Sequence, residues 1–397
     1  MHDTADVVVI GAGVNGASLA YHLAMAGVRN VLVLEKQAAA TGATGFSSGL
    51  VRMHYANEVE ARLALNSYAY FRNWADMIGG ECGFRETGFI RTVARKNTEK
   101  LRANVAMLQL IGVETSVITP GELHDLAPHI WAEDILLAAY EPHSGYADPT
   151  ATTLSFLDAA RHRGVKLLQH IEAQGFITRG ERVLGLQTSE GVIEAGTVVC
   201  ATGAWTMALL MKLGLRFPVW NVRHQVAILR RPTEAQADHM TFIDGMLDVY
   251  YRPDSPGLTL VGGGAMEPGV DPDRFERNAD DSFVEEIAAK VTRRMPTMEN
   301  ATYRRGWSGI FNISEDLHPL LGPVPGYENL YAIFGCNGTG FKIAPAVGKA
   351  LAEQIIGVRK QENPITSLRP ARYFEQAAIH DTYGYSDRSQ EHTEPPQ

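Results

Sequence analysis

The sequence predicts a mixed α/β and α+β fold, in which a domain built around a parallel sheet is interrupted by a second, β-rich domain. Three observations lead to this prediction. The chain opens with an apolar strand that runs through a glycine-rich turn into a helix and a second strand, over residues 7–35. Strand patterns dominate residues 217–264. A second glycine turn, at residues 336–342, opens an apolar helix near the other end, so both ends of the chain contribute to the first domain.

The opening unit has the order of parts that a Rossmann-like dinucleotide-binding domain requires. The strand VVVI runs into Gly11, and Gly13 and Gly16 follow at GxGxxG spacing. Gly11 allows a tight turn, Gly13 lets the backbone approach a pyrophosphate, and Gly16 lets the helix pack on the strand. The strand VLVL then ends at Glu35, an acid about twenty residues after the glycines. Glu35 can accept hydrogen bonds from ribose hydroxyls, which argues against a 2′-phosphate and therefore against NADP.

Helices and strands alternate in the next hundred residues. The loop TGATGFSSGLVRMHY is rich in small residues, which indicates backbone wrapped closely around a ligand. Helices are expected over residues 56–79 and 98–112, and strands over residues 88–94 and 135–142. The segment from Thr119 to Glu122 has the capping-box pattern and predicts the start of a short helix.

The middle of the chain is mostly β-structure. Asp148 and Pro149 suit the N-cap and first turn of a helix that continues over residues 150–164. Three short segments, QGFITRG, RVLGLQTS and GVIEAG, are separated by tight turns and predict an antiparallel meander. TVVCATGAW then repeats the opening theme of an apolar strand and a glycine turn. VRHQVAILR, DVYYRP and GLTLVGGG predict strands of the second domain, and a helix with apolar residues at helical spacing is expected over residues 280–296.

These patterns give a discontinuous division of the chain. The expected nucleotide-binding domain comprises residues 1–78, 146–215 and 303–375; the expected substrate domain comprises residues 79–145 and 216–302; and residues 376–397 are expected to form a flexible tail.

Composition excludes several other classes. The chain has 397 residues, 45% of them hydrophobic and 20% charged, as in a globular protein. A net charge of -9 gives no electrostatic footprint for nucleic acid. The three cysteines form no CxxC pair, the histidines lack metal-binding spacing, and no run of about 18 apolar residues predicts a membrane span. Because no signal peptide is apparent either, a cytoplasmic location is expected.

Four blocks of the sequence resemble the D-amino acid oxidase-like family of FAD-dependent oxidoreductases. They are the opening unit, the TGATGFSSGLVR loop, VVCATGAW, and LHPLLGPVPGYENLYAIFGCNGTGFKIAPAVGKALA. The resemblance extends over roughly the first 370 residues. Within the family, GWSGIFNISEDLHPLLGPVP is most similar to the sarcosine oxidase β subunit and to dimethylglycine dehydrogenase-type enzymes.

The resemblance implies bound FAD that accepts a hydride equivalent from the carbon beside an amine nitrogen. It places Gly11, Gly13, Val14, Gly16, Glu35 and Lys36 at the ADP half, Thr44, Ser48, Gly49 and Leu50 beside the pyrophosphate and flavin, Ala173, Ala201, Thr202, Gly203 and Trp205 on the adenosine side, and Gly338, Thr339, Gly340, Phe341 and Lys342 at the pyrimidine end of the flavin. A helix that starts near Ile343 directs its positive end at the flavin edge where charge collects on reduction.

Positions at which relatives attach a flavin covalently lack a suitable side chain here. By resemblance these are Phe46, Pro149 and Gly309, so noncovalent FAD and no second flavin are expected. Thr259 falls near a lysine credited with oxygen activation in monomeric sarcosine oxidase, which weakens the interpretation as an oxidase.

Four residues are candidates to bind and orient the substrate. Arg52 could pair with a substrate carboxylate, and Lys342 could contact the flavin or the same carboxylate. Tyr251 and Arg252 lie on a strand that covers the flavin in the family, and alternation places Tyr250 and Arg252 on one face and Tyr251 on the other. Which of the three faces the pocket stays open.

No general base is assigned, because a neutral amine can give up a hydride without one. His224 is expected in the core, His318 in a loop near the flavin edge, and Trp307 is equally suited to the core and to a pocket wall.

The predicted function is FAD-dependent oxidation of a small secondary or N-methylated amino acid, with a sarcosine-like substrate and oxygen or another electron acceptor. One alternative is oxidation of a 2-hydroxy acid or polyol phosphate on the same fold. A second is a non-catalytic flavoprotein subunit or assembly factor, since a fold does not fix a function. Assembly with copies of itself or with other chains stays open.

Overall fold

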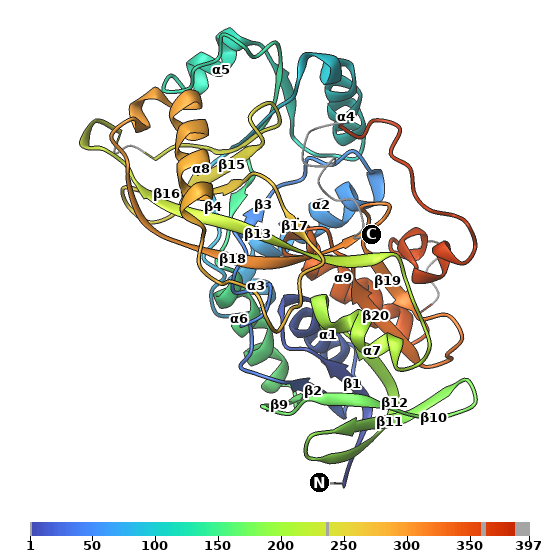
Figure 1. The fold of residues 1–397 in the computed structure, drawn as a ribbon. Helices are drawn as coiled ribbons and strands as arrows, with labels where there is room; N and C mark the ends of the chain where they lie inside the picture. Colours follow the sequence, from blue (N-terminus) through green and yellow to red (C-terminus); the bar gives the residue numbers. More distant parts are fainter. Residues whose placement is uncertain (1, 236–237, 359–362, 386–397) are drawn as a thin grey trace.

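The computed structural model describes residues 2–235, 238–358 and 363–385. Two large sheets organise these residues, one with eight strands and the other with nine. In Figure 1 the eight-stranded sheet lies in the lower half, and two long strands, β13 (Val219–Arg230) and β18 (Thr302–Ser314), cross the middle of the molecule. The site described below lies between the first sheet and these crossing strands.

The first sheet has the parallel centre that the opening unit predicts. Its order is β10-β11-β12-β1-β2-β9, with β12, β1, β2 and β9 parallel, while β20 is parallel to the second half of β12. The meander is confirmed, and GVIEAG and TVVC form one continuous strand. The strands are β1 (His2–Ile10), β2 (Val31–Glu35), β9 (Lys166–Gln169), β10 (Ala173–Arg179), β11 (Arg182–Thr188), β12 (Gly191–Cys200), β19 (Leu320–Pro323) and β20 (Leu330–Phe334).

The continuous apolar run in β1 reflects burial on both faces of this sheet. Val7 and Val9 belong to one hydrophobic cluster, which includes residues of α1, α2, α6 and α9, whereas Val8 and Ile10 belong to a second cluster on the opposite face. The helices are α1 (Val14–Met25), α2 (Glu58–Arg72), α3 (Trp74–Met77), α4 (Thr98–Leu110), α5 (Pro120–Leu126), α6 (Pro149–Arg161), α7 (Thr206–Met211), α8 (Asp281–Arg294) and α9 (Gly340–Ile355).

Helices α1 and α9 join the two ends of the chain. Gly348 allows the close approach, since a Cβ there would lie 2.3 Å from the Ser18 hydroxyl oxygen, and this hydroxyl donates to the Ala344 carbonyl at 2.8 Å. The expected helix starts are also confirmed: Thr119 and Glu122 form a capping box on α5, and Asp148 caps α6.

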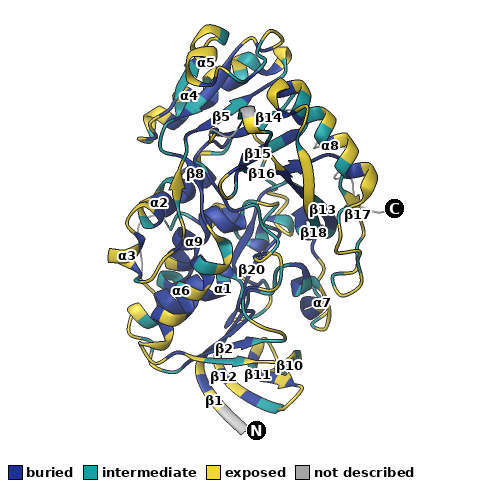
Figure 2. Cartoon of the chain, turned by 90° about the vertical axis from the view of Figure 1, so that its left-hand side faces the viewer, coloured by how far each residue is buried: buried dark blue, intermediate teal, exposed yellow. Residues whose placement is uncertain are grey.

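The second sheet is mixed, and strands from two distant parts of the sequence form it. Its order is β17-β13-β16-β15-β14-β5-β7-β6, with β18 on β13, and only the β14–β5 pair within it is parallel. Helix α8 packs with Phe283, Ile287 and Val291 inward, as their spacing predicts, and presents an exposed outer face (Figure 2). The remaining strands are β5 (Phe89–Thr92), β6 (Ser116–Ile118), β7 (Ala138–Glu141), β14 (Thr241–Asp244), β15 (Val249–Pro253), β16 (Leu258–Gly263) and β17 (Glu267–Pro268), and a small third sheet holds β3 (Leu50–Val51), β4 (Arg85–Glu86) and β8 (Gly145–Tyr146).

The domain ranges stay a prediction, because the structure gives strands rather than domain limits. One strand lies differently from the expected division. All of β18 except its first residue falls in the range 303–375, but the strand pairs along β13, from Val219 with Ser314 to Arg230 with Thr302. The second sheet therefore reaches directly over the nucleotide-binding part.

The described part of the expected tail, residues 376–385, packs against the body of the molecule. The Tyr385 ring stacks on His54, and its hydroxyl is 2.7 Å from His54 Nε2. Asp381 lies 3.4 Å from His318 Nε2, and Lys100 donates to the Gly384 carbonyl at 2.7 Å. Residues 386–397 lie outside the described residues, so their flexibility stays a prediction. No helix in the described ranges is both long and apolar enough to span a membrane.

Candidate active site

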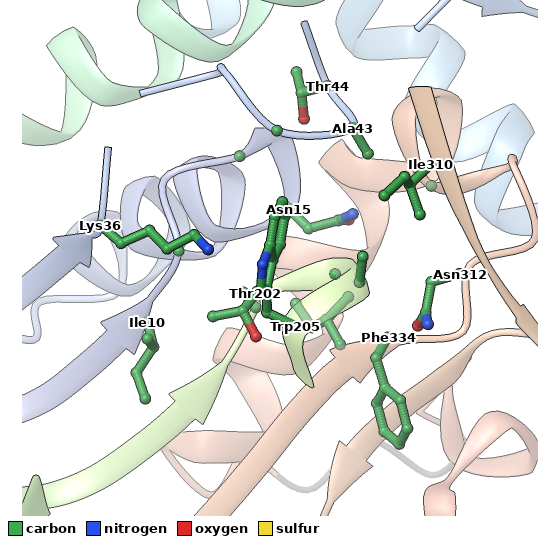
Figure 3. A pocket seen from close by; sticks show the side chains of 18 of the residues that line it. Ile10, Asn15, Lys36, Ala43, Thr44, Thr202, Trp205, Ile310, Asn312 and Phe334 are labelled. Atoms are coloured by element: carbon green, nitrogen blue, oxygen red, sulfur yellow. The ribbon is translucent and has the colours of Figure 1, made fainter. Parts of the chain in front are cut away.

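A cavity of about 660 Å³ opens at the carboxyl ends of β1, β2 and β12. Its walls come from the glycine turn after β1, the end of β2, loop 41–47, the turn 201–205, and residues of β18 and the 335–341 turn. Figure 3 shows Lys36 on one side of the cavity, Thr202 and Trp205 in the middle, and Asn312 and Phe334 on the other side. The cavity therefore extends from the predicted ribose-binding acid to the second glycine turn.

At Gly11 and Gly16, the first glycine turn leaves no room for a residue larger than glycine. Gly11 has φ +105°, and a Cβ there would lie 2.5 Å from the Ala201 carbonyl oxygen. At Gly16 a Cβ would lie 2.0 Å from the Gly11 oxygen, which agrees with its expected role in packing α1 on the turn. Thr44 holds the turn from the other side, since its hydroxyl accepts from the Val14 N–H at 3.1 Å.

Glu35 is fixed at the end of the cavity that is predicted to hold the adenosine. One carboxylate oxygen accepts from the Ala12 N–H at 2.9 Å and the other from the Gln37 N–H at 2.9 Å. Next to it, the Lys36 ammonium lies 4.2 Å from the centroid of the Trp205 ring. Glu35, Lys36 and Trp205 therefore form the wall of this end of the cavity.

The other end of the cavity is formed by the start of α9. Gly338 has φ +71° and lies against Phe311, and Phe341 lines the cavity. Because the first backbone N–H groups of a helix have no partner within it, this end of the cavity offers donors and positive potential. Asn312 supports the turn, since its side-chain oxygen accepts from the Gly335 N–H at 2.6 Å.

Most of the residues predicted to contact the cofactor line this cavity. Those that line it are Gly11, Gly13, Val14, Glu35, Lys36, Thr44, Ala173, Ala201, Thr202, Gly203, Trp205, Gly338, Gly340 and Phe341, and those outside its lining are Gly16, Ser48, Gly49, Leu50, Thr339 and Lys342. Of the second group, Leu50 is buried in the small sheet and the Ser48 carbonyl accepts from Arg252.

Sequence reasoning missed several residues of the lining. Asn15 lies inside the GxGxxG motif and Asn312 lies shortly after the GWSG run, so a motif-based analysis could have included both. Phe311 could have been suspected from the same run. Asp273 belongs to an irregular connection in the second domain, and nothing in its local sequence marks it.

Arg52 and Lys342 come together although 290 positions separate them in the sequence. Lys342 is buried, and burial together with the charge of Arg52 lowers its pKa well below the usual lysine range, more than Glu60 raises it. The Arg52 guanidinium lies 4.6 Å from the Tyr55 ring centroid and donates to the His54 carbonyl. Both cations thus lie around the start of α9.

Strand β15 confirms the alternation but not the expected role of Tyr251. Tyr251 is fully buried in the core of the second sheet, where it stacks on Phe242 at 5.1 Å between ring centroids. Arg252 donates to the Ser48 carbonyl at 2.6 Å and pairs with Asp254 at 3.0 Å. Tyr251 thus lies in the core, on the face of β15 opposite to Tyr250. Neither Tyr251 nor Arg252 lines the cavity, and Arg252 links β15 to loop 41–49.

Tyr250 and His224 form a buried polar pair near the cavity. Their Oη and Nε2 atoms are 2.9 Å apart, and the His224 ring stacks on Phe311, a cavity residue, at 4.6 Å. Burial lowers the pKa of His224 to about 4, so the ring is neutral at neutral pH. Its Nδ1 has no partner among the described residues. His224 is buried, as expected for a core histidine. The sequence did not predict that it would pack against a residue of the cavity.

The other residues that the sequence singled out make packing contacts or hydrogen bonds within the protein. The Thr259 hydroxyl contacts His239 Nε2 at 2.8 Å, outside the cavity lining. Gly309 packs on Phe46, since a Cβ there would lie 2.7 Å from the Phe46 Cβ, and the Trp307 indole donates to the Phe46 carbonyl at 3.1 Å. His318 is buried against Glu60, 2.6 Å from a carboxylate oxygen. These contacts fix the loop and the strand around the cavity.

A Rossmann-like unit with an acid-ended second strand, and a cavity that continues to the start of a second helix, define a dinucleotide-dependent oxidoreductase. The chain belongs to the DAO family of FAD-dependent oxidoreductases, whose family model, described as "FAD dependent oxidoreductase", matches residues 6–354. The earlier resemblance is confirmed.

Individual relatives are distant in sequence. Rat mitochondrial dimethylglycine dehydrogenase is 26% identical over 412 aligned residues, which cover 97% of this chain and 47% of that protein. The sarcosine oxidase β subunit of an Arthrobacter species is 26% identical, with 88% of this chain and 86% of that protein covered. The crystal structure of L-proline dehydrogenase from P. horikoshii superimposes with a TM-score of 0.88 at 26% identity, and covers 96% of this chain and 100% of that chain. The chain spans about half the length of the first curated relatives that it matches.

The residues of the cavity fit FAD, the cofactor of the family. Gly11, Gly13 and Gly338 have no side chains, so a ligand can approach the backbone there. Glu35 can bind ribose hydroxyls. Two helix N-termini can supply donors, one for the phosphates and one for the flavin edge. Bound FAD supplies a two-electron acceptor for a hydride equivalent. The residues that line the cavity would hold this cofactor.

Proposed function

We propose that the protein oxidises a small secondary or N-methylated amino acid, with a sarcosine-like compound as the first substrate to test. The observation that carries the proposal is the pair of basic side chains, Arg52 and Lys342, around the start of α9, where Gly340 and Phe341 line the cavity. Relatives with 26% identity are named for dimethylglycine and sarcosine, which supports the same substrate class.

Two cations close together in a buried place favour binding of an anion. Lys342 is buried, and burial and the charge of Arg52 lower its pKa, so the protein alone disfavours the protonated side chain. The nearby acids have other donors: Glu141 accepts from the Met53 N–H at 3.0 Å and from Ser144, and Glu60 is 2.6 Å from His318 Nδ1. A substrate carboxylate would supply the missing negative charge and accept hydrogen bonds from both cations.

The His224–Tyr250 pair supports an amine as the reacting group. Both side chains are uncharged at neutral pH, because burial lowers the pKa of His224 to about 4 and raises that of Tyr250 to about 12. A neutral pair beside Phe311 favours the uncharged amine, the form that can give up a hydride. Tyr250 replaces Tyr251 in this proposal, and neither member of the pair is given the role of a general base.

Anaerobic bleaching of the flavin tests the function. Sarcosine, dimethylglycine or proline should reduce the bound flavin, whereas lactate and glycerol phosphate should not. Bleaching by the hydroxy compounds alone would replace the proposal with the 2-hydroxy acid or polyol-phosphate alternative. Failure of every amine would favour a non-catalytic flavoprotein. Addition of air and measurement of peroxide then distinguish oxygen from another electron acceptor.

A further inference from the structure

The 269–280 connection, between β17 and α8, reaches from the second sheet to the adenosine end of the cavity. At its tip the Asp273 carboxylate accepts from the Lys36 ammonium at 2.5 Å and from the Trp205 indole N–H at 3.0 Å, both on the same oxygen. All three side chains line the cavity. One carboxylate thus joins the end of β2 and the turn after β12 to a connection of the second sheet.

The base of the 269–280 connection is firmly anchored. Arg223, whose side chain is 7% exposed, donates to the Glu276 carbonyl at 3.0 Å and to the Asn278 carbonyl at 2.8 Å, and pairs with Asp280 at 2.7 Å. The Ser308 N–H donates to the Arg277 carbonyl at 2.8 Å. These contacts tie the connection to β13 and β18, so its tip is not a free loop.

The tip is ordered by its own turn and held by partly exposed charges. The Asp273 N–H donates to the Asp271 carboxylate at 2.9 Å. The Lys36 and Asp273 side chains are 23% and 57% exposed. An ion pair with this exposure can open at low cost, and it weakens as salt rises. The contact therefore has the properties of a closure that opens and re-forms.

We propose that Asp273, together with Lys36 and Trp205, retains the adenosine half of FAD by closing the 269–280 connection over that end of the cavity. Closure places the Lys36–Trp205 pair beside Glu35, where the ribose is bound, and opening frees the path by which the adenosine enters and leaves. The inference rests on FAD as the family's cofactor and is independent of the proposed amine substrate.

Release of FAD from the holoprotein, followed by the return of flavin fluorescence after dilution, tests the inference. D273N keeps the shape of the side chain and removes its charge, and it should release FAD about two- to fivefold faster than the wild type at low salt. Raising the salt to about 1 M should bring the wild-type rate close to that of D273N. W205F, which loses the indole donor and part of the ring surface but keeps the Lys36–Asp273 ion pair, should change the rate in the same direction by less.

Two further variants show whether the effect of D273N comes from loss of this contact or from loss of any surface charge. E328Q removes an exposed carboxylate that pairs with Arg182 at 3.4 Å outside the cavity, and it should release FAD at the wild-type rate. The double variant K36M/D273N should release FAD more slowly than the product of the two single effects predicts, because both substitutions break one contact.

Hydrogen exchange provides a readout that needs no flavin signal. Binding of FAD should protect the amides of residues 269–280 in the wild type and protect them less in D273N. Equal release rates for D273N and wild type at low salt, or multiplicative effects of K36M and D273N, would overturn the inference. So would an absence of FAD-dependent protection in the 269–280 connection.

Discussion

At the scale of single residues, the proposed carboxylate site depends on the protonation of Lys342. Its ammonium is held in a buried place beside Arg52, which keeps its pKa well below the usual lysine range. A bound carboxylate stabilises the protonated form, so binding of an anion takes up a proton. The affinity for a carboxylate should therefore fall as the pH rises.

Substitution of either cation tests this linkage. R52Q and K342M should each weaken binding of a substrate carboxylate by roughly 10- to 100-fold, the effect of losing a hydrogen bond to a charged group. In K342M the fall in affinity with rising pH should disappear, whereas in R52Q it should shift to higher pH because the charge that lowers the pKa of Lys342 is removed. Titration of the flavin spectrum with acetate, a carboxylate that cannot reduce the flavin, measures both quantities.

The matched control is R62Q, which removes an exposed arginine that pairs with Glu58 at 2.7 Å on the surface of α2. It should bind carboxylates like the wild type. Unchanged affinity in both R52Q and K342M would rule out the proposed carboxylate site.

The contact between Phe46 and Gly309 leads to a second prediction at this scale. Neither side chain, nor Pro149, offers a nucleophile to the flavin, and a Cβ on Gly309 would lie 2.7 Å from the Phe46 Cβ. We expect noncovalent FAD, so precipitation with acid should leave a colourless pellet and a yellow supernatant. A pellet that stays yellow after washing would contradict this expectation.

At the scale of elements, the α1–α9 contact depends on Gly348. A Cβ at this position would lie 2.3 Å from the Ser18 hydroxyl oxygen and 2.7 Å from the Ser18 carbonyl carbon. Gly348→Val should lower the free energy of unfolding by about 1–3 kcal/mol, the usual cost of overpacking, as measured by urea denaturation. Because α1 and α9 both begin at the cavity, FAD affinity should fall as well.

Gly121 in α5 provides the control for this substitution. The nearest neighbour of a Cβ at Gly121 is the Thr119 hydroxyl at 3.9 Å, so G121A should be neutral or slightly stabilising. Similar losses in G121A and in Gly348→Val would show that packing between the two helices is not the cause.

At the scale of the whole molecule, His318 joins three distant segments. It lies 2.6 Å from Glu60 of α2 and 3.4 Å from Asp381 in the 376–385 segment. Burial opposes the charged ring, but hydrogen bonds and charges from Asp381 and Glu60 outweigh it and raise the pKa of His318 to about 10. The imidazolium therefore holds the last described segment against the first domain.

This raised pKa predicts how stability depends on pH. A group whose pKa rises on folding stabilises the protein fully below its unfolded pKa, about 6.5, and the stabilisation is lost as the pH approaches 10. The wild-type free energy of unfolding should fall over this range, and H318Q should show a flatter profile. H162Q, at the exposed end of α6, should keep the wild-type slope; a wild-type slope in H318Q would contradict the assignment.

The sequence predicted the parts of the fold that are determined by residues close together in the chain. The glycine spacing, the acid after β2, the meander and the caps at Thr119 and Asp148 each depend on neighbouring residues. The position of β18 on β13, the pairing of His224 with Tyr250, and the contact of Asp273 with Lys36 depend on residues that meet only in the folded molecule. Alternation along β15 was predicted, but only the packing of the second sheet decides which face meets loop 41–49.

The discontinuous walls of the cavity also determine when it can form during protein synthesis. The Gly11 turn leaves the ribosome first, but it packs against Ala201, and the flavin end requires Phe341. The nascent chain therefore lacks the second partner strand of β1 until β12, at residues 191–200, has been translated. Cofactor loading is expected to follow translation, and products terminated before α9 should accumulate as colourless, aggregation-prone fragments.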